Sequence, residues 1–133
     1  MKKPRQKGLN FVLNYGIYDF DVMYSLGEED DQLKRNLRKA APNISDEAIE
    51  DILTARSRGR TTMLTSGATV IRLRYVPKTP EDFGVLAHET FHAVEFLMAR
   101  INMPLVSSVS GEAYAYAIGF LTEQLFKHLK KVC

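Results

Sequence analysis

The chain has a single cysteine, Cys133, among its 133 residues, and it has no tryptophan. A single cysteine cannot form an internal disulfide, so nothing in the composition requires an oxidising compartment. A chain of this length can bury roughly two thirds of its unfolded surface without such a bond. We therefore expect a single domain over residues 1–133.

The chain also lacks long apolar runs and a large net charge. No stretch approaches the roughly 18 apolar residues of a membrane span, and no apolar segment of a signal peptide follows the basic residues of the N-terminus. The formal net charge of +2 is too small to indicate a polyanionic partner. We expect a cytoplasmic protein that binds neither membranes nor nucleic acid. The sequence does not indicate an oligomeric state. Residues 1–8 carry several basic side chains and are expected to form a frayed terminus: Lys2, Lys3, Arg5 and Lys7.

Two regions have the alternating pattern of strands. Residues 9–25 are rich in aromatic and β-branched types, and Gly16 can divide them into two strands. Residues 60–76 predict a hairpin around Ser66 and Gly67. One side of this hairpin would face the core with Ile71, Leu73 and Tyr75, and the other side would carry Arg72 and Arg74.

Helix signals occupy the remaining regions. Acidic residues near Glu28 open one short helix, and Ser45 can cap a second. Thr79, with Pro80 and Asp82, predicts a capped helix that runs to about Ile101. Ser108 or Ser110 can cap a last helix that begins near residue 111. The fold class is therefore α+β, with a short, mostly antiparallel sheet packed against two long helices.

The long helix contains a motif suited to metal chemistry. Residues 88–92 read HETFH, an H-E-x-x-H pattern. Four residues turn a helix by about 40° net, so His88 and His92 lie on one face and can bind a single Zn²⁺. Glu89 then lies beside the metal, where it can act as the general base on a zinc-bound water. The alternative is two helix-face histidines with ordinary hydrogen bonds.

A third ligand must come from another element, and Glu112 at the start of the last helix is the best candidate. The same carboxylate could instead complement the helix dipole, and both roles are compatible. Tyr116 lies one turn further on, where its hydroxyl could stabilise an oxyanion or could simply pack between helices. His128 is sixteen residues from Glu112 and is expected to be a surface residue.

HETFH followed by Glu112 resembles the gluzincin metallopeptidases, in which H-E-x-x-H is followed by a glutamate ligand on the next helix. The pattern is also similar to the short zincin domains of the ImmA/IrrE group and to small zincins of bacteriophage genomes. The resemblance covers about residues 60–125. It implies a small zincin-like domain that binds zinc through His88, His92 and Glu112 and hydrolyses a peptide bond of a peptide or protein substrate, with Glu89 as base. It also suggests that an extended peptide binds along the edge of the hairpin.

The chain departs from the family at one position. Many gluzincins have an aspartate one turn after the third ligand, and this chain has Tyr116 there, so another acid such as Asp82 or Glu95 would have to orient a histidine. An alternative function is a zincin-like binding or regulatory domain with a structural metal and little or no hydrolytic activity. A further alternative is a scaffold in which the motif occurs by chance.

Overall fold

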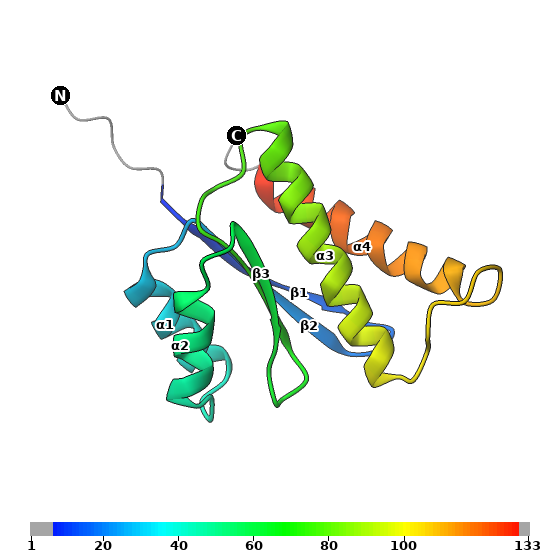
Figure 1. Cartoon of the computed structure of the whole chain (residues 1–133), viewed down its shortest axis with the longest axis horizontal. Helices are drawn as coiled ribbons and strands as arrows, with labels where there is room; N and C mark the ends of the chain where they lie inside the picture. Colours follow the sequence, from blue (N-terminus) through cyan, green and yellow to red (C-terminus); the bar gives the residue numbers. More distant parts are fainter. Residues whose placement is uncertain (1–6, 131–133) are drawn as a thin grey trace.

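The computed structural model describes residues 7–130, and Figure 1 shows their arrangement. Lys2, Lys3, Arg5 and Cys133, which were considered above, lie outside the described residues. Residues 7–130 form a four-stranded mixed sheet and four helices, which confirms the α+β class. The elements are β1 (Leu9–Tyr15), β2 (Phe20–Leu26), α1 (Asp30–Ala40), α2 (Asp46–Thr54), β3 (Gly59–Met63), β4 (Thr69–Leu73), α3 (Pro80–Arg100) and α4 (Gly111–Lys130).

The sheet has the strand order β1-β2-β4-β3. The β1–β2 and β3–β4 pairs are antiparallel hairpins, and β2 pairs with β4 in parallel. The predicted division of residues 9–25 is confirmed, because the chain turns at residues 16–19 with Asp19 at a positive φ of 47°. The order leaves β3 at one edge of the sheet.

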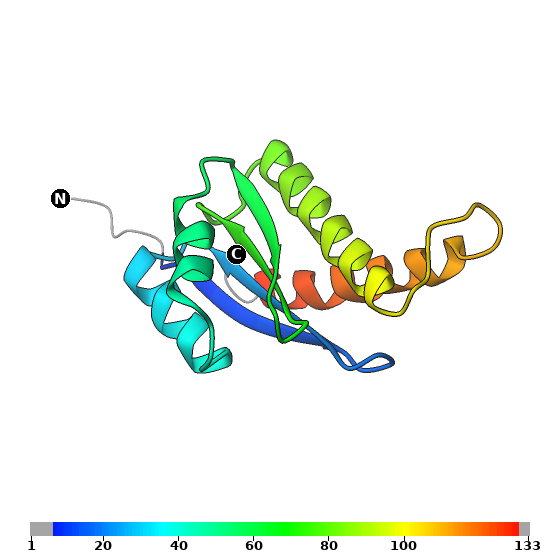
Figure 2. The same ribbon diagram turned by 60° about the horizontal axis from the view of Figure 1, so that its bottom comes forward.

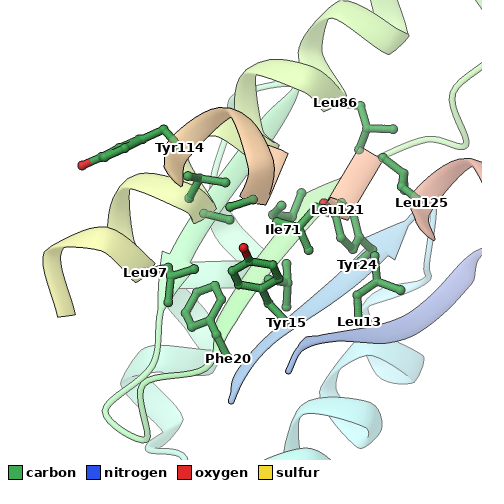
Figure 3. Packing of buried hydrophobic residues seen from close by; sticks show 14 of the residues in the cluster. Leu13, Tyr15, Phe20, Tyr24, Ile71, Leu86, Leu97, Tyr114, Leu121 and Leu125 are labelled. Atoms are coloured by element: carbon green, nitrogen blue, oxygen red, sulfur yellow. The ribbon is translucent and has the colours of Figure 1, made fainter. Parts of the chain in front are cut away.

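Helices cover both faces of the sheet (Figures 1 and 2). On one face α3 packs on β3 and β4, and α4 packs on β1 and on α3. Their core contains Phe20, Tyr24, Ile71, Leu86, Leu97 and Leu121, several of which Figure 3 shows converging between the sheet and the two helices. On the other face α1 and α2 cover a smaller cluster: Met23, Leu33, Leu37, Ile49, Ile52 and Val70.

The expected helix caps are confirmed at two sites. Ser45 accepts a hydrogen bond from the Ala48 backbone N–H at 3.1 Å. Thr79 and Asp82 form a reciprocal capping box at the start of α3. The backbone N–H groups of Lys78 and Thr79 donate to the Asp82 carboxylate and lower the pKa of that group.

Ser110 precedes α4 as expected but does not cap it with its side chain. Its hydroxyl donates to the Pro104 carbonyl and accepts from the Val106 N–H, so these two bonds hold the α3–α4 connection in a turn.

Arg72 lies on the face of β4 opposite the core of Ile71 and Leu73, as expected, but its side chain is only 5% exposed. No helix within residues 7–130 is both long and apolar enough to cross a bilayer.

Candidate metal centre

The two motif histidines lie on the solvent side of α3, away from the sheet. Their Nε2 atoms are 3.0 Å apart. Two nitrogen ligands at about 2.05 Å from a tetrahedral zinc ion lie about 3.3 Å apart. The imidazoles of His88 and His92 are therefore already at nearly the separation that a shared zinc ion requires. This geometry follows from their i,i+4 spacing on one helix.

The ring of His92 is oriented by a carboxylate. Glu95, one turn along α3, accepts a hydrogen bond from His92 Nδ1 at 2.7 Å. A neutral imidazole that donates through Nδ1 accepts through Nε2, so Nε2 of His92 accepts the 3.0 Å hydrogen bond from Nε2 of His88. Glu95 thus orients the ring of His92. From the sequence, Asp82 and Glu95 were both possible in this role. Asp82 instead serves the α3 capping box and pairs with Arg58 at 2.8 Å.

Glu89 points in a different direction from the histidines, toward the sheet. It is 7% exposed, and Thr61 of β3 donates a hydrogen bond of 2.5 Å to its Oε2 atom. The next residue, Thr90, forms a 3.0 Å hydroxyl–hydroxyl hydrogen bond with Tyr24 of β2. Burial raises the pKa of Tyr24 to about 12, and the bond to Thr90 offsets only part of the rise. The phenol therefore stays neutral, and two strands hold two consecutive motif residues.

Glu112 and Tyr116 lie elsewhere. They line an open pocket on α4 with Ala115, Gly119, Phe120 and Glu123. Tyr116 is 64% exposed and lies close enough to Tyr15 of β1 that, after burial and Tyr18, it contributes to a raised pKa of that tyrosine. Among residues 7–130, no hydrogen bond or ion pair joins Glu112 or Tyr116 to the motif residues.

The rotation of α4 explains this placement. Its buried stripe consists of Tyr114, Ala117, Leu121, Leu125 and Leu129. Glu112 precedes Tyr114 by two residues, or about 200° of helical rotation, so burying Tyr114 turns Glu112 toward the opposite side. Within the described part of the chain, no group of three or more His, Cys, Asp or Glu side chains is arranged to hold a metal ion. The structure thus brings together the two imidazoles and Glu95, but it does not bring Glu112 to them.

A mostly apolar pocket lies beside Glu95, the hydrogen-bond partner of His92. It lies between the second half of α3 and the α3–α4 connection, and its walls include Phe91, Glu95, Met103, Leu105 and Tyr114. The Tyr114 hydroxyl donates to the Met103 carbonyl at 2.6 Å and so holds the connection against α4. Any molecule bound in this pocket would lie beside Glu95.

Comparison with known proteins adds no further evidence, because no protein family, curated protein or solved structure matches the chain. The chemistry of the site therefore rests on its own residues. They fit a zinc ion in part, since two imidazole nitrogens converge and Glu95 orients one of the rings, whereas the buried Glu89 carboxylate is held toward the sheet.

Nothing in the sequence marks Thr61 or Tyr24 as part of the site. Both are ordinary strand residues, and only their contacts with α3 distinguish them. The alternation in GRTTM does indicate that Gly59, Thr61 and Met63 share one face of the strand. It gives no indication of which helix residue that face meets.

Proposed function

We propose that the chain is a zinc-dependent metallopeptidase in which His88 and His92 hold the metal and Glu89 is the general base. Glu112 faces away from the histidines, so it would complete the ligand set only after a rotation of α4. The 3.0 Å contact between the two Nε2 atoms carries this proposal, because it is a hydrogen bond whose shared proton a bound zinc ion would replace. Two imidazoles and a carboxylate form a zinc ligand set known from peptide hydrolysis. When bound, zinc supplies a Lewis acid that polarises a carbonyl and makes water a better nucleophile.

Glu89 moves the proton in this proposal. It accepts a proton from the attacking water and later delivers one to the leaving amine. Its burial beside Thr61 holds the carboxylate in one orientation and limits competition from bulk water. Because β3 is an edge strand, an extended peptide that adds to this edge would pass beside Glu89. This arrangement supports a peptide or protein substrate, and Tyr116 stays a candidate for the oxyanion-stabilising group.

A second candidate function is favoured by the position of Glu112 on the outward face of α4. A site with two imidazoles and no third protein ligand lacks the ligand set of a hydrolytic zinc centre. The chain would then be a binding or regulatory domain in which hydrolysis is slow or absent. The apolar pocket beside Glu95 would then bind a partner rather than a substrate side chain.

The first test measures zinc content and cleavage of a peptide library with protein purified without a metal-binding tag. We expect one zinc per chain and measurable cleavage. Glu89→Gln should keep the zinc and lose activity by at least about 100-fold. Glu123→Gln, an exposed α4 carboxylate paired with Lys127 at 3.5 Å, is the matched control and should retain both. A protein that binds zinc no more tightly than about 1 μM would refute the proposal.

Glu112→Gln separates the two candidates. Loss of a ligand should weaken zinc binding by 10-fold or more and abolish turnover. Unchanged zinc affinity would remove Glu112 from the ligand set. Full zinc occupancy with no cleavage by the unmodified protein would favour the regulatory domain.

A further inference from the structure

Glu89 is buried on the sheet side of α3, whereas the neighbouring His88 is exposed. A carboxylate that leaves water needs hydrogen-bond donors to offset the lost hydration. The side chain must therefore be held by something other than solvent. Two residues on the same face of the edge strand β3 surround it, Gly59 and Thr61.

Thr61 contacts Glu89 twice. Its Oγ1 lies 2.5 Å from Glu89 Oε2 and 3.0 Å from the Glu89 carbonyl oxygen. The hydroxyl has one proton, and its shorter contact is the one with Oε2, so the proton is donated to Oε2. A single hydroxyl thereby fixes the end of the Glu89 side chain relative to its own backbone.

Gly59 leaves space for the stem of the same side chain. A Cβ atom at position 59 would lie 2.8 Å from Val85 Cγ1 and 3.1 Å from Glu89 Cγ. Any other residue there would have to displace the side chains of Val85 and Glu89, or α3 as a whole. The glycine therefore allows the Glu89 methylenes to lie directly against the strand.

We propose that Gly59 and Thr61 are positioning residues that present one defined oxygen of Glu89 to the reaction. Thr61 occupies Oε2, and Oε1 makes no hydrogen bond with any residue from 7 to 130. Oε1 is thus the atom that takes and returns the proton, while Oε2 stays bound to the strand. This inference rests on the proposed function. It adds that the edge strand itself, and not only α3, sets the geometry of the base.

The first arm of the test needs no activity and no zinc. A double-mutant cycle with Thr61→Val and Glu89→Met in chelator measures their coupling in urea unfolding. A hydrogen bond to a charged group predicts a coupling of about tenfold in the unfolding equilibrium constant. Tyr24→Phe is the matched control, because it removes the neighbouring strand-to-helix bond to Thr90. The coupling between Tyr24→Phe and Glu89→Met should change the unfolding equilibrium constant by no more than about twofold. A Thr61→Val coupling as small as that of the control would overturn the proposal.

The second arm measures kinetics with the zinc-loaded protein. Thr61→Val should lower kcat by about 10- to 100-fold with KM and zinc content unchanged, since small displacements of a catalytic group are costly. Thr61→Ser, which restores the hydroxyl, should recover kcat to within about threefold of the unmodified protein. Equal losses in Thr61→Val and Tyr24→Phe, or no recovery in Thr61→Ser, would assign Thr61 a purely structural role. If the unmodified protein cleaves nothing, the proposed function fails, and the first arm still decides whether the strand holds Glu89.

Discussion

Binding of zinc at the histidine pair should stabilise the folded chain by an amount that follows from the zinc concentration relative to Kd and from the chain length. The two Nε2 atoms converge only in the helical conformation of α3, because the four-residue spacing brings them to 3.0 Å there. A ligand that binds only the folded state at 100 times its Kd stabilises that state by about 2.7 kcal/mol. Zinc should therefore report on the site without any assumption about catalysis.

The number of residues in the chain allows this stabilisation energy to be expressed as a shift in Tm. Unfolding entropy of about 2.1 cal/mol/K per residue gives roughly 280 cal/mol/K for 133 residues. A stabilisation of 2.7 kcal/mol then raises the Tm by about 10 °C. His88→Ala or His92→Ala removes one of two imidazoles and should abolish most of this shift.

The assay is a thermal melt in chelator and in increasing zinc. His128→Ala is the matched control: this third histidine is half-buried at the end of α4, stacked on Phe11 with ring centroids 4.2 Å apart. It should lower the baseline Tm but keep the full zinc shift. A melt that does not move by more than about 1 °C at saturating zinc, or the same shift in His92→Ala, would show that the histidine pair is not the metal site.

Three further predictions concern stability. Leu97→Ala removes a fully buried side chain between α3 and the sheet, and should cost about 2–5 kcal/mol in urea unfolding. Arg72→Met should cost about 1–3 kcal/mol in the same assay, because the guanidinium donates to the Ile52 and Leu53 carbonyls at the end of α2. The lowered pKa of Asp82 means that the folded state releases its proton more readily than the unfolded state. Its stabilisation is thus present above 3.8, the ordinary pKa, and is lost as the pH falls through the lower folded value. The difference in urea midpoint between the unmodified protein and Asp82→Asn should accordingly be constant at neutral pH and shrink below about pH 4.

Local patterns in the sequence predicted most of the elements. Ser45, Thr79 and Asp82 marked two helix starts because capping depends on residues within one turn. Apolar alternation predicted the two strands within residues 9–25 and the hairpin of residues 60–76, since side-chain direction in a strand repeats every two residues. The sequence did not specify the parallel pairing of β2 with β4, which depends on how α1 and α2 cross between the strands.

The residues of the candidate site also fall into two groups, those placed by local helical spacing and those placed by tertiary contacts. The sequence by itself determined that His88 and His92 share a helix face with Glu95 one turn on, because four-residue and three-residue spacings are fixed by the helix. Only the tertiary structure decided that Thr61, 28 residues from Glu89 along the chain, holds that carboxylate. The tertiary structure also decided where Glu112 lies, because the burial of Tyr114 and of the other apolar residues on that face of α4 sets the rotation of the helix. Helical spacing is a local property of the backbone, whereas contacts between elements depend on rotations and registers that the whole core sets together.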